Sequence, residues 1–551
     1  MLFTGRLTIF IYVRDIRRGI FHRISNEMNS SLMKLAPHHL FATMTVCCLW
    51  LTAAGVFGQP ESSLVYPGND GKLVYEKHAN TAESNADNLM IDYSHCGFMG
   101  GGVAIPDVPV KVTLYPQFGD DQQRIQEAID YVSGLEPDAQ GYRGAVLLKA
   151  GSYELGNELL SQSDALQIRK SGVVLRGEGQ GSDGTILTSS FEVKHQMIAT
   201  RPERPSAGQS HHTRISDPYV GSGVHGFHVE DASGYAVGDT IFVRFTPNQT
   251  WLDETYANAY MGDGDIDWDT DTYTLNYERI ITHVEDDSIA IHSPVILPMQ
   301  EKYGGGAIVK LTYPEPRLNR VGVENMRLVG TGITPSCQAD NPNRLKTAVH
   351  FSYTENSWIR SITVLHTSNS LFKMWDSHHN TIEDCASVEP LGPKRAGYRY
   401  TFYFDAASSH NFCQRTYTDD GRHDYVLGPR IPGPNVFLDG VSQRGGTQGP
   451  HQRWATGTLF DNLKLESMIA LEHRNGSGSG HSWAGVQSTL WNTESPSIIC
   501  DAPAGHLNYA IGNTGNEAQS WYVDNTQAGV YRGYYDSHGT HVATRSLYLK
   551  Q

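Results

Sequence analysis

The stretch NSWIRSITV (356–364) is followed 24 residues later by a similar one, NTIEDCASV (380–388). Further along, VFLDGV (436–441) is followed 22 residues later by TLFDNL (458–463). Each stretch joins a short run of β-branched and apolar side chains to Asn or Gly at a corner. A loose period in the low twenties built from such runs predicts a solenoid of stacked strands. No helical period separates the runs, which argues against an alternating βαβ fold.

The segment before these repeats predicts the start of the same solenoid. Asp120-Asp121 precede apolar residues at helical spacing, so we expect one amphipathic helix over about 121–134. This helix would cap the open first coil and protect it from edge pairing. The runs 145–148 and 173–175, each closed by glycine, read as strands.

The amino-acid pattern changes between about residues 200 and 318. Strand-like runs at 239–244 and 288–292 flank a loop rich in Trp, Tyr and Asp, which predicts an inserted β subdomain. Its residues Trp251 and Trp268 either stack on sugar rings or pack in the core, and core packing is the commoner use of a tryptophan. The predicted division is therefore a signal peptide with its upstream segment (1–58), a polar lead-in (59–88), the first coils (89–199), the insertion (200–318) and the main coils (319–551).

The N-terminal segment has the pattern of an export signal. Met33-Lys34 opens a polar stretch, an apolar run covers 40–56, and small residues precede Gly58. A membrane anchor is the alternative, but the run is short for a bilayer span and contains Thr and Gly. We expect a secreted or periplasmic protein without a stable membrane anchor, acting as a monomer.

Charge restricts the partners of the mature chain. Residues 1–58 hold six Lys or Arg and two Asp or Glu, so their removal changes the formal net charge from −16 to about −20. Such an acidic chain is not a general nucleic-acid binder. An anionic substrate would need a local island of positive charge.

Cysteine and aspartate patterns give little support for a metal. Five scattered cysteines follow the signal, with no CxxC pair, so we predict neither a disulfide scaffold nor a zinc site. Calcium is a possible cofactor, because aspartates alternate from Asp263 to Asp271. These aspartates lack the Gly and Glu positions of an EF-hand and equally fit a solvated face.

One segment concentrates residues that are able to do chemistry. Between 394 and 454, Arg, His, Lys and Tyr recur at a spacing that fits successive coils, and stacked coils would bring them into one anion-binding groove. The alternative is structural: ion pairs at turns and hydrogen-bonded corner residues. The residues that we predict to form this groove are Lys394, Arg395, Tyr398, Tyr400, Arg422, His423, Arg430, Asn435, His451, Arg453 and Trp454. A second cluster adds His473 and His481 within a glycine-rich loop, which either lines the substrate or forms a tight turn.

These residue types suit β-elimination of a uronate. The reaction needs a cation or amide to neutralise the C6 carboxylate, a base for the C5 proton, and an acid for the leaving oxygen. We assign binding and neutralisation of the carboxylate or sulfate to Arg422, Arg430 and Arg453, with Asn435 assisting. His423 or His451 would be base or acid, with Tyr398 or Tyr400 as the partner. Substrate binding would fall to Lys394, Arg395, Arg430, Asn435, Arg453, Trp454, His473 and His481.

Hydrolysis is the rival reaction, because Asp405, Asp419, Asp420, Asp424 and Asp439 could supply a carboxylate pair. The Asn-Thr-Asp, Asp-Asp and Gly-His-Gly set of polygalacturonases is missing, as is any Gly-x-Ser-x-Gly. A carbohydrate-binding solenoid without catalysis is the third interpretation.

Several stretches resemble a known group. Asp92-Tyr93-Ser94 to Gly102, the strand 144–151, Gly172–Gly177 and Asp231–Asp239 resemble the pectate lyase superfamily of rhamnogalacturonase- and epimerase-like proteins. The stretches 422–426, 432–435, 449–457 and 480–485 are similar to bacterial lyases of uronate polysaccharides such as ulvan. The resemblance implies an all-β, right-handed parallel β-helix and polysaccharide cleavage by elimination. Because the superfamily also holds hydrolases, epimerases and phage tail proteins, the fold alone does not fix the reaction.

Overall fold

The computed structural model describes residues 58–551, except 157–158, 161–162, 204–207, 313–315 and 524–526. Residues 59–551 form one compact unit. The predicted signal peptide falls on residues 1–57, which lie outside the described residues. Among the described residues, no helix combines the length and the apolar character needed to cross a membrane.

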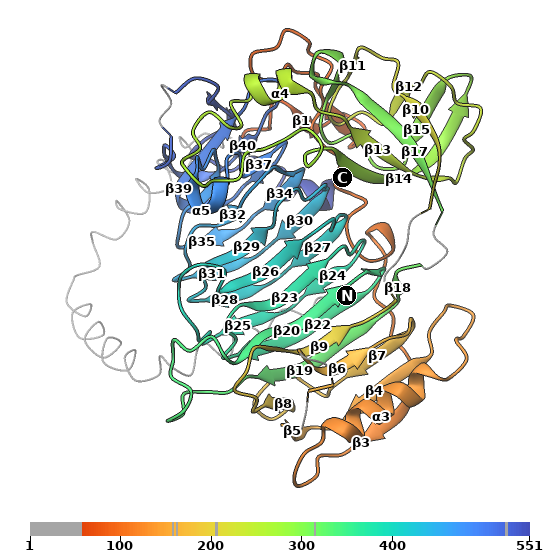
Figure 1. Ribbon diagram of the computed structural model, residues 1–551, viewed down its shortest axis with the longest axis vertical. Coiled ribbons are helices and arrows are strands. Elements are labelled where there is room, and N and C mark those ends of the chain that lie inside the picture. Colours follow the sequence, from red (N-terminus) through yellow and green to blue (C-terminus); the bar gives the residue numbers. More distant parts are fainter. Residues whose placement is uncertain (1–57, 157–158, 161–162, 204–207, 313–315, 524–526) are drawn as a thin grey trace, which may run out of the picture. The chain divides into compact units, whose positions relative to one another are not determined.

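A seven-stranded parallel sheet forms one face of the solenoid (Figure 1). Each strand pairs in parallel with the strand of the next coil. In spatial order the strands are β6 (Asp164–Ile168), β9 (His195–Thr200), β20 (Leu345–Ser352), β23 (Ser370–Trp375), β26 (Tyr400–Asp405), β29 (His423–Leu427) and β32 (Gly449–Pro450).

The other faces of the coils are also mainly parallel. One row contains β3 (Val110–Leu114), β4 (Gly144–Leu148), β7 (Val173–Arg176), β19 (Gly322–Val329), β22 (Trp358–Leu365), β24 (Thr381–Glu383), β27 (Asn411–Gln414), β30 (Asn435–Leu438), β34 (Thr458–Asp461), β38 (Thr489–Trp491), β40 (Tyr509–Ile511) and β43 (Tyr534–Asp536). The long strands β19 and β22 continue into a further row with β5 (Gly151–Leu155), β8 (Thr185–Ser189), β25 (Ala386–Val388), β28 (Tyr417–Asp419), β31 (Val441–Gln443), β35 (Lys464–Leu465), β39 (Glu494–Ala502) and β41 (Thr514–Glu517).

The repeats read from the sequence are neighbouring coils. Trp358 pairs with Thr381 and Thr363 with Ala386, so the two stretches quoted first lie side by side. Val436 pairs with Leu459, which joins the second pair of stretches in the same way. The prediction of an all-β protein with parallel sheets is confirmed.

Stacked aromatic side chains fill the inside of the coils. Phe404 stacks on Phe437 with ring centroids 4.8 Å apart, and Phe437 stacks on Phe460 at 5.5 Å. All three are fully or almost fully buried. Burying such a side chain stabilises the fold by about 1.5–3 kcal/mol relative to leaving it exposed, so each coil depends on its neighbours for its core.

An asparagine ladder joins the corners of three coils. The side-chain amide of Asn380 donates to Oδ1 of Asn411 at 3.0 Å, and that of Asn411 donates to Oδ1 of Asn435 at 3.2 Å. The same oxygens accept the backbone N–H groups of Asn380 and Asn411. Asn435 has no exposed surface. The structure therefore places this predicted substrate-binding residue inside the solenoid wall.

The helix expected at 121–134 is α3 (Gln122–Ser133), which confirms that prediction. Its residues Ile125, Ala128, Ile129 and Val132 are buried in the core of the first coils. Of the two aspartates that precede the helix, Asp120 holds the N-terminal turn. Asp120 Oδ1 accepts from the backbone N–H of Gln122 at 2.8 Å, while the Asp121 side chain pairs with Arg124.

The segment predicted as an insertion forms an antiparallel sheet. Its strands, in spatial order, are β10 (Gly208–Arg214), β17 (Gly306–Thr312), β13 (Thr240–Phe245), β14 (Leu275–Glu285), β15 (Ser288–Ile291) and β12 (Gly226–His228). It packs on the later coils, where the Trp251 ring lies 4.8 Å from the Trp454 ring. Trp251 and Trp268 are both buried, so they serve the core and have no surface for a sugar.

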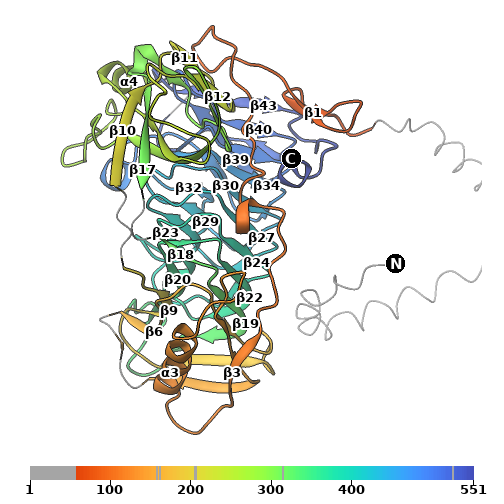
Figure 2. The same ribbon diagram turned by 90° about the vertical axis from the view of Figure 1, so that its right-hand side faces the viewer.

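The N-terminal segment also lies against the last coils. It contains β1 (Val65–Pro67) and β2 (Leu73–Tyr75), and Figure 2 shows β1 on the side of β40 and β43. The Ser63 backbone N–H donates to Asp536, the Tyr93 hydroxyl contacts Thr489 Oγ1 at 3.2 Å, and the Tyr93 N–H donates to Gln551 at 2.9 Å. The chain then runs back to α3 at the opposite end of the stack (Figure 2).

Candidate active site

A groove of about 460 Å³ lies on the outer face of the seven-stranded sheet. We call it the groove. The residues that line it are Asn369, Lys373, Ala396, Gly397, Tyr400, Tyr403, Arg422, His451, Gln452, Arg474, Ser477, Gly478, Ser479 and His481. A smaller pocket adjoins it, shares His451 and Arg474, and is also lined by His423, Met468 and Trp521.

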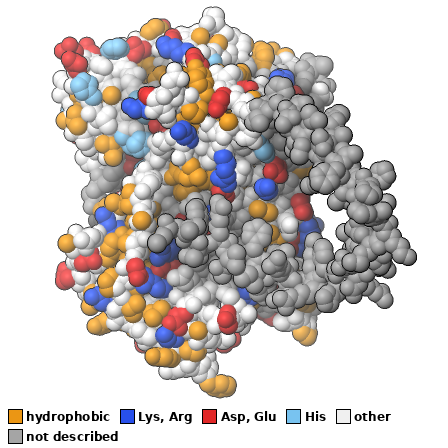
Figure 3. Space-filling view, turned by 180° about the vertical axis from the view of Figure 1, so that it is seen from behind, with side chains coloured by type: hydrophobic (Ala, Val, Ile, Leu, Met, Phe, Trp, Pro, Cys, Tyr) orange, Lys and Arg blue, Asp and Glu red, His pale blue; other side chains and the backbone are white. Residues whose placement is uncertain are grey.

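The groove lining contains three cationic side chains, Lys373, Arg422 and Arg474, and no carboxylate. The opposite side of the molecule differs, since its Lys and Arg side chains lie among Asp and Glu side chains in several places (Figure 3). Two carboxylates lie beside the groove: Asp405, which pairs with Lys373 at 2.9 Å, and Glu472 of the adjoining pocket, which lies 3.9 Å from Arg474. A local excess of positive charge in a chain of net charge −16 makes this the place where an anion would bind.

Strand alternation explains why these side chains face outward. In β23, Phe372 and Met374 enter the core, and Lys373 between them faces the groove. In β26, Phe402 and Phe404 enter the core, and Tyr403 faces the groove. The register then pairs Lys373 with Tyr403, and Tyr400 with His423. Successive coils therefore place polar groups side by side, about 4.8 Å apart.

A hydrogen-bonded chain runs from Tyr400 through His451 to Arg474. Arg474 Nη1 lies 3.0 Å from His451 Nδ1, and the Tyr400 hydroxyl lies 2.9 Å from His451 Nε2. Because a guanidinium only donates, Nδ1 of His451 is an acceptor, and the proton of the neutral imidazole is on Nε2. Nε2 then donates to the oxygen of Tyr400. The hydroxyl proton of Tyr400 is left free to point at a ligand.

Burial sets the protonation states of Tyr400 and His451 in this hydrogen-bonded series. It raises the pKa of Tyr400 above its ordinary value of 10.0, while nearby Arg422 opposes the rise. Burial, His423 and Arg474 hold the pKa of His451 far below 6.5. At neutral pH, Tyr400 is therefore a phenol that carries its proton, and His451 is a neutral imidazole.

Two further histidines flank His451. His423 Nδ1 lies 2.5 Å from the carbonyl oxygen of Thr447, and its buried Nε2 has no hydrogen-bond partner within the described protein. His481 likewise has a buried, unpartnered Nδ1. Their rings lie 4.6 and 5.2 Å from the ring of His451. Burial lowers the pKa to about 3 for His423 and about 4 for His481, so both imidazoles are neutral.

Arg453 positions one wall of the groove without lining it. Its guanidinium donates to the Ser479 carbonyl at 2.7 Å and to the Ser479 hydroxyl at 2.6 Å. The loop bends at Gly478, where φ is +73° and an added Cβ would lie 2.3 Å from the His481 ring. Only glycine fits this approach. Arg453 and Gly478 together hold His481 at the groove.

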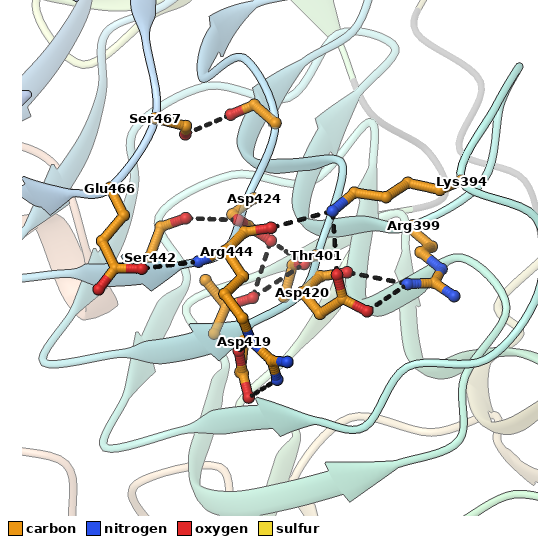
Figure 4. A network of polar contacts seen from close by, with 12 residues as sticks. Lys394, Arg399, Thr401, Asp419, Asp420, Asp424, Ser442, Arg444, Glu466 and Ser467 are labelled. Atoms are coloured by element: carbon orange, nitrogen blue, oxygen red, sulfur yellow. Dashed lines mark hydrogen bonds and ion pairs between the residues drawn. The ribbon is translucent and has the colours of Figure 1, made fainter. Parts of the chain in front are cut away.

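The other end of the predicted cluster lies outside the groove (Figure 4). Lys394 pairs with Asp420 at 3.0 Å and donates to the Arg444 carbonyl. Asp424 is fully buried and accepts from Thr401, Thr418, Ser442 and Gln448, in the network drawn in Figure 4. This network anchors the start of β29, where His423 lies.

The remaining predicted residues are divided between surface and core. Arg395 is exposed, and the Tyr398 ring lies 5.5 Å from the ammonium of Lys194. The Arg430 guanidinium lies 5.7 Å from the ring centroid of Tyr273 in the insertion. Trp454 and His473 have no exposed surface. Of the predicted site residues, the groove lining brings together Tyr400, Arg422, His451 and His481, with His423 in the adjoining pocket.

The groove-lining residues that the sequence prediction did not name as site residues include Lys373, Tyr403 and Arg474. The signal for two of them was present. FKMW (372–375) and FYFD (402–405) each place one polar or amphipathic residue between two core residues, which marks it as outward-facing on a strand. Arg474 follows β36 (Ile469–Leu471) in the glycine-rich loop that the sequence predicted either to line the substrate or to form a tight turn, but only His473 and His481 of that loop were named as site residues.

One group of histidines has the spacing of a metal site. His292, His379 and His410 have ring nitrogens within 4.8 Å of one another. The backbone N–H of Ile280 donates to His292 Nδ1 at 2.9 Å, so the proton of neutral His292 lies on Nε2 and occupies the lone pair that a metal would need. Both nitrogens of His410 contact serine hydroxyls, at Ser409 and Ser293. The hydrogen bond between His410 and Ser293 connects the insertion to the coils, and these contacts together do not fit a metal centre.

The aspartates considered for calcium are used locally. Asp265 accepts from the Gly262 N–H at 2.7 Å, and Asp269 from the Thr272 hydroxyl at 2.6 Å. Within the described residues, the run 263–271 does not bring three acidic groups within metal-binding distance of one another.

No protein-family model matches the sequence, and no curated protein sequence matches it. Several solved structures are similar to parts of this chain. ORF18 of Geobacillus virus E2 is 12% identical, with a TM-score of 0.36, over 78% of this chain and 59% of that chain, so this chain spans less than two thirds of its length. The Streptococcus pneumoniae surface adhesin PfbA is 10% identical over 79% of this chain and 80% of its own, with a TM-score of 0.35. The A-module of the Azotobacter vinelandii mannuronan C-5 epimerase AlgE6 is 12% identical over 79% and 99%, with a TM-score of 0.31. At this level of similarity they assign no activity to this chain.

Proposed function

We propose that this protein is an exported polysaccharide lyase, built as a right-handed parallel β-helix of the pectate lyase type, that cleaves a uronate-containing polysaccharide by β-elimination. One observation carries the proposal: a cationic groove without carboxylates contains a tyrosine whose hydroxyl proton is free. Right-handedness is the expectation for parallel strands joined by crossover connections. Export rests on the signal pattern of residues 1–58.

The groove supplies each group that the reaction requires. Arg422, whose guanidinium lies 5.9 Å from the ring centroid of Tyr400, binds and neutralises the C6 carboxylate, which makes the C5 proton more acidic. His481 lines the groove as a neutral imidazole and takes that proton. A bound carboxylate raises the pKa of His481 toward neutrality, so its basicity increases when substrate is present.

Tyr400 completes the elimination as the acid. The C5–H bond breaks, its electron pair forms the C4–C5 double bond, and the C4–O bond breaks as Tyr400 gives its proton to the departing glycosidic oxygen. His451 holds the tyrosine oxygen through Nε2–H, and Arg474 fixes the tautomer of His451. The rings of the two proton-transfer groups each lie 5.2 Å from the ring of His451.

Hydrolysis fits the groove less well. A glycosidase needs two carboxylates flanking the bond, about 5–10 Å apart. Three of the candidate aspartates are in ion pairs away from the groove lining: Asp419 with Arg444, Asp420 with Lys394, and Asp439 with Arg545. Asp424 is buried in its own network, and Asp405 pairs with Lys373.

The test is the ultraviolet absorbance of the new C4–C5 double bond during incubation with ulvan, pectate, alginate, glucuronan and glycosaminoglycans. We expect absorbance to rise on one of these polymers and to be lost in Tyr400→Phe, which keeps the ring and removes the proton. Tyr417→Phe is the matched control, because Tyr417 lies on β28 and bonds Gln443 at 2.7 Å outside the groove.

New reducing ends without the absorbance would replace elimination by hydrolysis. Binding of every polymer with no product would replace the enzyme by a carbohydrate-binding solenoid. Equal turnover by Tyr400→Phe and Tyr417→Phe would remove Tyr400 from the mechanism.

A further inference from the structure

Lysines from three successive coils meet beyond one end of the groove. Lys194 lies next to the start of β9, Lys346 is in β20 and Lys373 is in β23. We call them the lysine cluster. Lys373 already lines the groove, and Lys346 lies beside Asn369, whose backbone N–H donates to its carbonyl at 3.1 Å. The cluster therefore continues the groove toward the N-terminal coils.

The charges of the cluster are poorly balanced by the protein. Lys373 pairs with Asp405, but within the described chain no carboxylate oxygen lies within 4.0 Å of the ammonium groups of Lys194 and Lys346. Burial lowers the pKa of Lys346, and the positive charges of Lys373 and Lys194 lower it further. Three ammonium groups that repel one another beside one carboxylate raise the free energy of the unliganded protein, and a bound anion would relieve this repulsion.

A buried acceptor lies in the same place. His350 pairs in register with Lys373 and contacts Gln196 Oε1 through Nδ1 at 2.6 Å. Since the amide oxygen only accepts, Nδ1 carries the proton and Nε2 is a lone pair, which has no partner in the described protein. His350 is 9% exposed. An unpaired buried acceptor next to ammonium groups suits a ligand that brings both a hydroxyl donor and an anion.

We propose that the lysine cluster and His350 form a second sugar subsite, which binds the carboxylate or sulfate of a unit further along the same polysaccharide. Lys346 and Lys194 hold the anion, and His350 Nε2 accepts a sugar hydroxyl. The glycan then runs across the strands, along the direction in which the coils stack. The direction of the glycan in this inference rests on the proposed function. The subsite itself binds anions whether or not the groove is catalytic.

The test measures retention of the protein in gels that contain polygalacturonate, dextran sulfate or neutral dextran. The double variant Lys194→Gln/Lys346→Gln should bind at least one of the two anionic polymers about tenfold more weakly, with a smaller salt dependence, since two charged contacts are lost. Lys464→Gln is the control, because Lys464 pairs with Glu494 on the unrelated strand β35. Lys194→Arg/Lys346→Arg should restore binding, and equal melting temperatures will establish that all variants are folded.

Loss on polygalacturonate alone assigns the subsite to carboxylate, and loss on dextran sulfate alone assigns it to sulfate. Binding by the double variant within twofold of the Lys464→Gln control on both polymers overturns the subsite. The proposed function fails separately: if no polymer gives the double-bond absorbance while the double variant still loses binding, the subsite stands and the lyase does not.

Discussion

The molecule contains two histidine triplets with similar spacing and different surroundings. The joint triplet, His292, His379 and His410, lies where the insertion meets the coils, and its rings pack within 6.4 Å of one another. The groove triplet, His423, His451 and His481, packs within about the same range. All six imidazoles are held neutral by burial, so neither ring spacing nor protonation state separates the two triplets.

The two triplets differ in the partners of their ring nitrogens. In the joint triplet, backbone groups and serine hydroxyls contact His292 Nδ1, His379 Nδ1 and both nitrogens of His410, while the buried Nε2 of His292 has no partner in the described protein. In the groove triplet, His451 bonds a tyrosine and an arginine that both face the groove, and two further nitrogens have no protein partner. Unpartnered nitrogens occur in both triplets, so what separates them is position: His451 and His481 line the groove, whereas the joint triplet lies where the insertion meets the coils.

The largest expected effect on kcat comes from replacing the central histidine of the groove triplet. We expect His451→Ala to lower kcat by about 100-fold or more, because Tyr400 loses the donor that orients its oxygen. The measurement is the initial rate of double-bond absorbance on the active polymer, with the melting temperature as a check of folding. Full turnover by this variant would show that the chain from Tyr400 to Arg474 has no catalytic role.

A smaller loss should follow from Arg474→Lys. Lysine keeps the charge but cannot at once reach His451 Nδ1 and the Tyr522 hydroxyl, which Arg474 contacts at 3.0 and 3.1 Å. We expect about a tenfold lower kcat/KM and a shift of the acid limb in the pH profile. A profile identical to that of the wild type would assign Arg474 to charge alone.

The joint triplet should respond in stability and not in rate. His410→Ala removes the hydrogen bonds to Ser293 and Ser409 and a stacked ring, so the free energy of unfolding should fall by about 1–3 kcal/mol. Activity per folded molecule should match the wild type, as measured by active-site titration beside denaturant unfolding. A large loss of kcat at unchanged stability would reverse the assignment of the two triplets.

Acid should unfold the protein through both triplets. The pKa values of His379 and His423 are lowered to about 3 from 6.5, so below pH 6.5 the unfolded chain takes up protons that the folded chain refuses. Their contribution to stability is complete above pH 6.5 and is lost as the pH falls toward about 3. Unfolding free energies measured at several pH values should show this slope, and His379→Gln should reduce it by up to one proton.

The smallest expected effect is that of metal. Zn²⁺ should shift the melting temperature of the wild type no more than that of His292→Gln, because the proton on His292 Nε2 stands in the way of ligation. A stabilisation found only in the wild type would convert the joint triplet into a metal site.

The sequence contained most of the fold and part of the site. Period and turn residues predicted stacked parallel strands, and apolar spacing located α3 to within a residue at each end. Residue type located four residues of the groove lining: Tyr400, Arg422, His451 and His481. It could not separate them from Asn435 or Trp454, because a buried amide or indole has the same sequence signature as one that binds a substrate. Lys373 was missed because it lies outside the segment 394–454, in which the candidate residues are close together in sequence. The solenoid brings it to the groove by pairing β23 with β26 of the next coil.

The N-terminal segment has a consequence for how the protein is made. Ser63 and Tyr93 contact Asp536, Thr489 and Gln551, so residues that leave the ribosome first wait for nearly the whole chain before finding their partners. Contacts of such sequence separation are slow to form. We expect nascent chains truncated before the last coils to keep their first segment accessible to proteases. Under the export that we propose, this delay would keep the N-terminal segment unfolded until the last coils have been made.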